Sequence, residues 1–357
     1  MRAMDSPRTL RTPADLAAAE LAPASPALEK VAARYAVAIT PAMTDLIRGG
    51  AASDPIARQF VPSREELFDA PGEDADPIGD DVHSPVEGVV HRYPDRVLLK
   101  LVHVCAVYCR FCFRRTMVGP GKRKSLAPRA LETALAYIRA HDEIWEVILT
   151  GGDPLMLSPA RLRKVMGELR TIEHIKVVRL HTRIPAVEPK RVTRELVSAL
   201  SAARKATYVV LHANHPREMT AAALAACARI VDAGLPMLSQ SVLLRGVNDD
   251  AATLEALMRS FVAARIKPYY LHHGDLAPGT AHLRTTIEEG QAVVGALLGR
   301  ASGLCQPAYV LDIPGGHGKS PIGPTYLSGG PEGYAVRDWQ GISHRYRDRV
   351  RHKKKQP

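Results

Sequence analysis

The sequence predicts an α/β protein built as an incomplete (β/α) barrel, and two patterns carry this prediction. Short apolar runs rich in β-branched residues recur at 96–103, 145–150, 175–182, 207–213, 236–243, 266–273 and 308–313. Such nearly continuous apolar runs are typical of parallel strands that are buried on both faces. Stretches with helical periodicity lie between them, at 127–141, 158–170, 189–205, 220–234, 250–265 and 286–300.

The helical stretches support this alternation because several begin with residues that favour the first turn of a helix. Ser158, Thr220 and Asp250 stand where a capping side chain is expected. A complete barrel has eight β/α units, whereas about six are visible here. We therefore expect an incomplete barrel.

Three regions are expected along the chain. Residues 1–85 are rich in Ala and Pro and predict an N-terminal helical region, with a helix in PALEKVAARYAVAI and an acidic, turn-rich connection in PGEDADPIGDD. Residues 86–320 contain the partial barrel. Residues 321–357 form a short C-terminal extension that ends in the basic tail HRYRDRVRHKKKQP.

The composition is that of a globular protein able to bury a core, with 357 residues, 46% hydrophobic and 24% charged. No apolar run approaches the roughly 20 residues that span a bilayer, and the N-terminus lacks the apolar centre of a signal peptide. We therefore expect a cytoplasmic protein. Much of the net charge of +11 lies in the basic tail. We interpret this tail as a solvated end, with contact to nucleic acid or an acidic protein as the alternative.

Polar residues stand at the ends of the predicted strands. In a barrel of this type, ligands bind where the strands end, so these residues are expected to meet at one rim. They are Cys105 to Cys112, Gly151 to Asp153, His181, Arg183, His212, Asn214, Gln240, Asp275 and Asp312.

The cysteines after the first strand form the pattern C-x3-C-x2-C, with Cys105, Cys109 and Cys112. Three thiolates can hold three irons of a 4Fe–4S cluster and leave the fourth iron open to a small molecule. The alternative is a zinc site completed by a distant His or by Cys227 or Cys305.

The segment DIPGGHGKSP places Lys319 in a glycine-rich loop. A phosphate-binding loop requires a glycine where Ile313 stands and a helix after the lysine, and neither is present in the sequence. We therefore favour a lysine that forms a Schiff base with pyridoxal phosphate.

The segments CAVYCRFC and ILTGGDPL resemble the signature of the radical S-adenosylmethionine (SAM) enzymes. The resemblance narrows to the lysine 2,3-aminomutase family between about residues 85 and 325, because HRYPDR, CRFCFRR, SVLLRGVND, PYYLHHGDL and DIPGGHGK all occur in family order. It implies a radical SAM type of partial barrel, in which Cys105, Cys109 and Cys112 hold the cluster. The expected SAM contacts are Gly151, Gly152, Asp153, His212 and Gln240.

The same resemblance implies an isomerase that converts lysine to β-lysine by 5′-deoxyadenosyl radical chemistry. Its cofactors are a 4Fe–4S cluster, SAM and pyridoxal phosphate, and its partners are the small substrate and a reductant protein such as flavodoxin or ferredoxin. Lys319 is expected to carry pyridoxal phosphate, with Arg92 and Arg96 beside it. The expected substrate ligands are Arg114 for the carboxylate and Asp275 and Asp312 for the distant ammonium.

Two departures from the family pattern matter. Asp250 stands where longer members have a zinc-binding cysteine, and residues 320–357 contain no cysteine, so we expect no structural zinc and leave any homo-oligomer open. Phe111 and Phe113 resemble the branch linked to elongation factor P, which acts on free or protein-attached lysine. That branch is the first alternative, and a non-catalytic, metal-stabilised nucleic-acid-binding protein is the second.

Overall fold

The computed structural model describes residues 8–48, 53–119, 124–330 and 333–348 and contains a nine-stranded sheet in the order β1 to β9. Seven neighbouring strands are parallel, and β1 and β9 pair antiparallel at the two edges. The strands are β1 (Val89–Tyr93), β2 (Arg96–Val102), β3 (Glu146–Gly151), β4 (Val177–Thr182), β5 (Ala206–His212), β6 (Met237–Val242), β7 (Ile266–His272), β8 (Ala308–Ile313) and β9 (Gly318–Pro321). The predicted partial barrel is confirmed.

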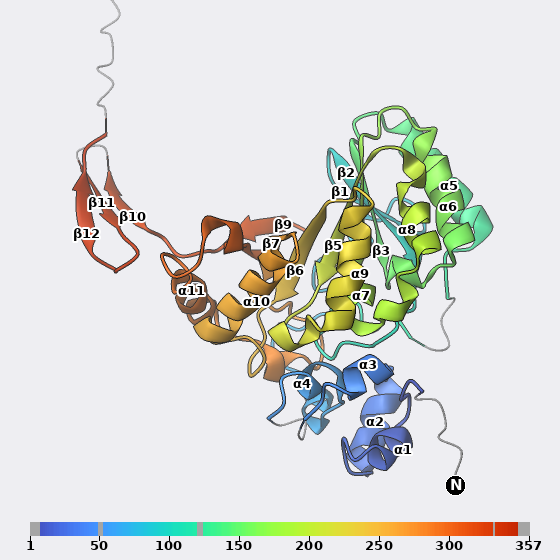
Figure 1. The fold of residues 1–357 in the computed structure, drawn as a ribbon, viewed down its shortest axis with the longest axis horizontal. Coiled ribbons are helices and arrows are strands. Elements are labelled where there is room, and N and C mark those ends of the chain that lie inside the picture. Colours follow the sequence, from blue (N-terminus) through green and yellow to red (C-terminus); the bar gives the residue numbers. More distant parts are fainter. Residues whose placement is uncertain (1–7, 49–52, 120–123, 331–332, 349–357) are drawn as a thin grey trace, which may run out of the picture.

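A helix joins each parallel strand to the next, and these helices lie on the outer face of the curved sheet (Figure 1). They are α5 (Pro128–Ala140), α6 (Pro159–Arg170), α8 (Arg194–Leu200), α9 (Ala221–Asp232), α10 (Ala251–Ala263) and α11 (Ile287–Gly295), with the short α7 (Ile184–Val187) before α8. Ser158, Thr220 and Asp250 accept hydrogen bonds from the first turns of α6, α9 and α10, as expected. Asp250 thus caps α10, at the position where the family resemblance would have suggested a zinc-binding cysteine.

The strands separate a core from a cavity. In β3, Val147 and Leu149 are fully buried in the hydrophobic core beneath the helices. The alternate residues Ile148 and Thr150 line the cavity inside the barrel. This alternation follows from the two faces of a strand, and it directs functional side chains inward.

The two edges of the sheet approach each other without pairing. The backbone N–H of Lys319 in β9 donates to the hydroxyl of Tyr93 at the end of β1, at 2.7 Å. The chain before β1 also reaches this region, because His83 Nε2 lies 3.0 Å from the carbonyl oxygen of Gly316. The barrel is therefore nearly closed, and the loop that carries Lys319 is held from the opposite edge.

The N-terminal helices pack at one end of the barrel (Figure 1). They are α1 (Pro13–Ala18), α2 (Pro26–Arg34), α3 (Pro41–Thr44) and α4 (Ala57–Phe60). The helix expected over 26–39 therefore ends early, at Arg34. Buried Glu66 accepts hydrogen bonds from Arg110 and Arg115, so this region is tied to the loop after β2 by desolvated charge pairs.

Short 3-10 turns complete the secondary structure. They are η1 (Arg64–Leu67), η2 (Asp81–His83), η3 (Pro154–Met156), η4 (Pro189–Arg191), η5 (Ser201–Ala203), η6 (Pro216–Glu218), η7 (Ala281–Leu283) and η8 (Gly303–Cys305). Two of them, η4 and η5, flank α8, so the helix expected over 189–205 is only seven residues long. No helix within the described ranges is long and apolar enough to cross a membrane.

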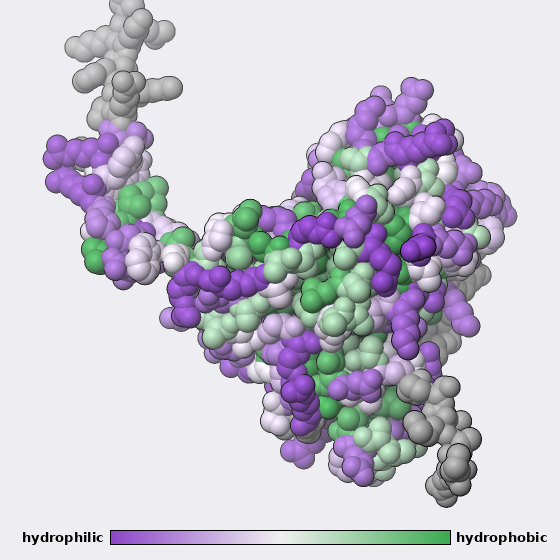
Figure 2. Space-filling view, viewed as in Figure 1, coloured by the Kyte–Doolittle hydropathy of each residue, from purple (hydrophilic) through white to green (hydrophobic). Residues whose placement is uncertain are grey.

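The C-terminal extension contains strands that the sequence patterns did not predict. β10 (Leu327–Gly330), β11 (Gly333–Arg337) and β12 (Ser343–Tyr346) form a separate antiparallel sheet. It projects from the barrel in Figure 1, and Figure 2 shows hydrophobic and hydrophilic residues mixed on its surface. These strands are short, polar and contain glycine, so the sequence has no apolar run from which they could be predicted. Of the basic tail, residues 349–357 lie outside the described part of the chain.

Candidate active site

One cavity of about 360 Å³ extends from the carboxyl ends of the parallel strands into the barrel. It brings together every residue to which the family resemblance assigned a role. These residues are Arg92, Arg96, Cys105, Cys109, Cys112, Arg114, Gly151, Gly152, Asp153, His212, Gln240, Asp275, Asp312 and Lys319. His181 and Arg183 also line the cavity, whereas Asn214 lies fully buried behind it.

The three cysteines of the loop after β2 are half-buried beside this cavity. Burial raises the pKa of the Cys105 thiol well above its ordinary value and that of Cys112 to about 11. Both thiols are therefore protonated at neutral pH, and a bound metal supplies the positive charge that turns such thiols into thiolates. The donor set fits an iron–sulfur cluster, because each thiolate of such a cluster binds a different iron.

The zinc-site alternative finds no fourth ligand among the remaining cysteines. Cys227 in α9 and Cys305 in η8 are buried in the hydrophobic core and do not line the cavity. Within the part of the chain that the structure describes, no group of three or more His, Cys, Asp or Glu side chains is arranged to hold a single metal ion.

The glycine segment after β3 presses against the strand that leads into the cysteine loop. A side chain added at Gly151 would lie 2.4 Å from the carbonyl oxygen of Val102, and one at Gly152 would lie 2.3 Å from that of Val104. Gly151 also has a φ of +110°, which side chains disfavour. The glycines thus permit a close contact between two backbone segments, which fixes the cysteine loop relative to the β3 end.

Asp153 uses its carboxylate within the protein. It accepts hydrogen bonds from the hydroxyl of Thr182 at 2.8 Å and from the backbone N–H groups of Arg183 at 2.7 Å and Leu155 at 3.0 Å. Although burial raises the pKa of Asp153, these donors stabilise its ionised form. The side chain therefore ties the β3 and β4 ends together beneath the cavity.

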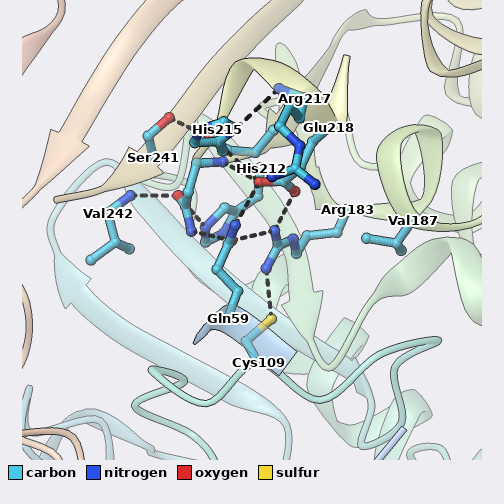
Figure 3. A network of polar contacts seen from close by, with 12 residues as sticks. Gln59, Cys109, Arg183, Val187, His212, His215, Arg217, Glu218, Ser241 and Val242 are labelled. Carbon is cyan, nitrogen blue, oxygen red and sulfur yellow. Dashed lines mark hydrogen bonds and ion pairs between the residues drawn. The ribbon is translucent and has the colours of Figure 1, made fainter. Parts of the chain in front are cut away.

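A buried polar network supports the cysteine loop from behind (Figure 3). Arg183 donates to the sulfur of Cys109 at 2.9 Å and to Glu218 at 2.5 Å. Gln59 of α4 accepts from Arg183 at 3.0 Å and from the side-chain amide of Asn214 at 3.1 Å. The ends of β4 and β5 and the N-terminal region are thereby joined at one cysteine.

Another part of the cavity lining, here called the lysine side, carries the predicted lysine and its carboxylates. Lys319 Nζ lies 2.5 Å from Asp312 Oδ1, and His272 Nδ1 lies 3.5 Å from Asp312 Oδ2. Although burial raises the pKa of Asp312, His272 and Lys319 together hold it well below its usual value. Asp275 is different: burial and the nearby charge of Asp312 raise its pKa to about 7, and its Oδ1 atom is buried with no hydrogen-bond partner.

Two of the predicted arginines, Arg92 and Arg114, share one buried carboxylate, Asp80, that sequence reasoning missed. Asp80 Oδ2 accepts from Arg114 Nη2 at 2.8 Å and Nε at 3.1 Å, and Asp80 Oδ1 accepts from Arg92 Nη2 at 3.2 Å. Only one edge of the Arg114 guanidinium is used in this way, so Nη1 remains for a ligand. No motif marked Asp80, which stands in an acidic, turn-rich connection.

Further charged and aromatic residues inside the barrel were also missed. Arg179 of β4 and Tyr269 and Tyr270 of β7 line the cavity, and the two tyrosine rings are tilted against each other with their centres 3.9 Å apart. Tyr93 lines it as well, and Arg96 lies over its ring, 4.0 Å from the centre. These residues could have been predicted from the sequence, because each is a charged or hydroxyl-bearing side chain within an otherwise apolar strand. Cavity-lining residues with a buried polar atom that has no partner are Arg92, Arg179, His181, Arg183 and Asp275.

Two known protein families match parts of this chain. The model of the radical SAM superfamily matches residues 99–257, and that of lysine-2,3-aminomutase matches residues 294–356. L-Lysine 2,3-aminomutase of Clostridium subterminale is 38% identical over 315 residues, which cover 88% of this chain and 75% of that protein. The enzyme of the same name from Acetoanaerobium sticklandii is 39% identical over 87% of this chain and 75% of its own length.

A relative that is named for a different substrate has a similar sequence identity to this chain. Glutamate 2,3-aminomutase of Clostridioides difficile is 35% identical over 88% of this chain and 74% of its own length. Aminomutases are isomerases, so the hypothesis of a non-catalytic nucleic-acid-binding protein is wrong. With such identity over most of both proteins, the chain belongs to the lysine 2,3-aminomutase family of radical SAM enzymes, whose membership implies a 4Fe–4S cluster and SAM.

Proposed function

We propose that this aminomutase converts free lysine to β-lysine with a 4Fe–4S cluster, SAM and pyridoxal phosphate. The observation that carries the proposal is that the three cysteines, Lys319 and the two aspartates Asp275 and Asp312 line a single cavity. A radical made at the cluster is useful only if the reacting carbon is held beside it, out of water.

The cysteine side of the cavity would hold the cluster through Cys105, Cys109 and Cys112, and SAM would take the open iron. When bound, these groups supply a 5′-deoxyadenosyl radical. The protein's part is placement: the β3 end sets the shape of the site, while His212 and Gln240 line the wall beside it. Burial lowers the pKa of His212 well below its ordinary value, so this imidazole is neutral and can accept as well as donate a hydrogen bond.

Lys319 would hold pyridoxal phosphate, which supplies a ring that stabilises an unpaired electron on the substrate. The surrounding side chains fit such a group. Arg92 and Arg179 each have a buried Nε atom without a partner, and a phosphate or phenolic oxygen is the kind of acceptor these donors need. Tyr269 adds an aromatic wall to the same part of the cavity. When the Lys319 amine is not bound to pyridoxal phosphate, it would form an ion pair with Asp312, as it does in this structure.

The substrate would be held at both ends. The free edge of the Arg114 guanidinium suits a carboxylate, and the ionised forms of Asp275 and Asp312 suit an ammonium at the end of the side chain. Glutamate carries a carboxylate where lysine carries this ammonium, so two buried aspartates oppose it. Lysine is therefore favoured over glutamate.

Free lysine is also favoured over protein-attached lysine, which is one of the two substrates that the elongation factor P-linked alternative allows. Attachment through the carboxyl group removes the anion that Arg114 would bind, and attachment through the side chain removes the ammonium. Phe111 and Phe113, which suggested that branch, have local contacts here. Phe111 lies 5.6 Å from the ring of His212, and Phe113 lies under Arg114 at 4.3 Å.

The test is an anaerobic assay of the reconstituted enzyme with SAM, pyridoxal phosphate and dithionite, which replaces the reductant protein. Lysine, glutamate, arginine and lysyl-elongation factor P are supplied in parallel, and β-amino acid products are measured by mass spectrometry. We expect β-lysine from free lysine and no product from glutamate. Product from the protein substrate alone would establish the alternative, and β-glutamate would contradict the role given to Asp275 and Asp312.

A further inference from the structure

Arg183 has contacts that the proposed lysine chemistry does not use. It follows β4, only 7% of its surface is exposed, and its side chain points at the cysteine loop (Figure 3). Nη1 donates to Cys109 Sγ at 2.9 Å, while Nη2 donates to Glu218 Oε2 at 2.5 Å and to Gln59 Oε1 at 3.0 Å.

The partners of Arg183 are themselves fixed. Glu218 Oε1 accepts from the backbone N–H groups of Asn214 at 2.8 Å and His215 at 3.0 Å, and from the side-chain amide of Gln59 at 3.1 Å. The guanidinium lies between Phe60, at 4.8 Å, and Phe111, at 5.6 Å. It cannot turn away from Cys109 without breaking buried, charge-assisted hydrogen bonds.

A donor aimed at a ligating sulfur changes the electronic properties of a cluster. One-electron reduction adds negative charge that is shared with the thiolates, so an N–H group on a thiolate stabilises the reduced cluster more than the oxidised one. The effect grows where water is excluded, and the groups around Arg183 are buried. The charge of Glu218 limits the gain, since it neutralises part of the guanidinium.

We propose that Arg183 is a positioning residue of the cluster: its Nη1–H group holds the Cys109 thiolate and raises the reduction potential of the 4Fe–4S centre. The proposal rests on the cluster part of the proposed function and not on the lysine chemistry. It therefore stands or falls separately from the identity of the amino acid substrate.

The test is a redox titration of the reconstituted protein without lysine or pyridoxal phosphate, followed by electron paramagnetic resonance of the reduced cluster. In Arg183→Met, we expect reduction to be at least tenfold less favourable at a given potential, a downward shift of about 59 mV for one electron. Arg183→Lys keeps the charge beside Glu218 but is too short to reach Cys109, so its shift has the same sign. Glu218→Gln removes the opposing charge and should shift the potential upward.

Arg217→Met is the matched control. Arg217 is a partly buried guanidinium next to Glu218 in sequence, but it pairs with Asp54 at 3.0 Å and makes no contact with a cysteine. Its loss should leave the potential unchanged. If Arg183→Met does not take up iron, the titration of Arg183→Lys decides the question.

One result would overturn the proposal, namely an unchanged potential in Arg183→Lys or Arg183→Met at full iron content. Equilibrium dialysis then says what the guanidinium does instead, because weaker SAM binding in the same variant would assign it to SAM.

Discussion

The cysteine side and the lysine side of the cavity are built in different ways. On the cysteine side, the three thiols lie within the eight residues 105–112, on one loop. On the lysine side, Asp275, Asp312 and Lys319 come from the ends of β7, β8 and β9, and Asp80 reaches in from the N-terminal region. The first site is local in sequence and the second depends on the tertiary fold.

The two sides of the cavity also differ in the charges that their side chains carry. Burial raises the pKa of the Cys105 and Cys112 thiols, so both are neutral in the absence of a metal. The lysine side is already charged and paired, with Lys319 on Asp312 and Arg114 on Asp80. A cofactor or substrate that binds on the lysine side therefore has to replace partners in existing ion pairs. A cluster that binds on the cysteine side instead converts the neutral thiols of Cys105 and Cys112 to thiolates.

The largest effects should come from variants that abolish cofactor binding on one side of the cavity and leave the other side intact. In Lys319→Ala, we expect loss of the pyridoxal absorbance and a fall in β-lysine formation of at least about 10³-fold, with iron content unchanged. In Cys109→Ala, we expect loss of the cluster absorbance with the pyridoxal absorbance retained. Absorbance spectra and iron analysis check both. Loss of both cofactors in either variant would contradict the view that the two sides are assembled independently.

The next effect concerns the carboxylate that organises the arginines. In Asp80→Asn, Arg114 loses a charge-assisted partner, and we expect the KM for lysine to rise roughly 10- to 100-fold, as the loss of about 1.5–3 kcal/mol predicts. Asp81→Asn is the control, because it removes the same charge from the exposed neighbouring residue. Steady-state kinetics distinguish the two. A rise of equal size in both variants would show that only the net charge matters.

A smaller effect is the pH dependence of lysine binding. Because burial and Asp312 raise the pKa of Asp275 to about 7, this carboxyl is neutral below pH 7 and ionised above it. The substrate ammonium binds the ionised form, so the KM for lysine should rise about tenfold for each pH unit below 7. In Asp275→Asn this part of the pH dependence should disappear. A wild-type profile that is flat between pH 6 and 8 would be inconsistent with the buried carboxyl described here.

The smallest effect is structural and concerns the backbone contact behind the cysteine side. Gly152→Ala places a methyl group 2.3 Å from the carbonyl oxygen of Val104, and we expect it to destabilise the fold by about 1–3 kcal/mol. Gly167→Ala, in the middle of α6 with open space around it, should instead stabilise by about 0.5–1 kcal/mol. Denaturant unfolding checks both. Equal stability of the two variants would mean that the close approach is unnecessary.

The contrast between the two sides also explains how much could be read from the sequence. Periodicity predicted the parallel strands and their helices, and the odd number of clustered cysteines indicated a cluster with an open position. Asp275 and Asp312 stood only among several polar residues at strand ends, and their role as substrate ligands came from the family resemblance alone. Asp80 was missed because an aspartate in an acidic, turn-rich segment has no distinguishing pattern. Its burial and its two arginine partners exist only after folding.

The proposed function requires both sides of the cavity to act on one lysine molecule. The most direct test supplies lysine carrying deuterium on the β-carbon to the reconstituted enzyme and follows the label by mass spectrometry. If the radical source and the lysine side share one site, deuterium should appear in 5′-deoxyadenosine or SAM and return to the α-carbon of β-lysine. Unlabelled 5′-deoxyadenosine, formed while lysine remains unchanged, would contradict the account.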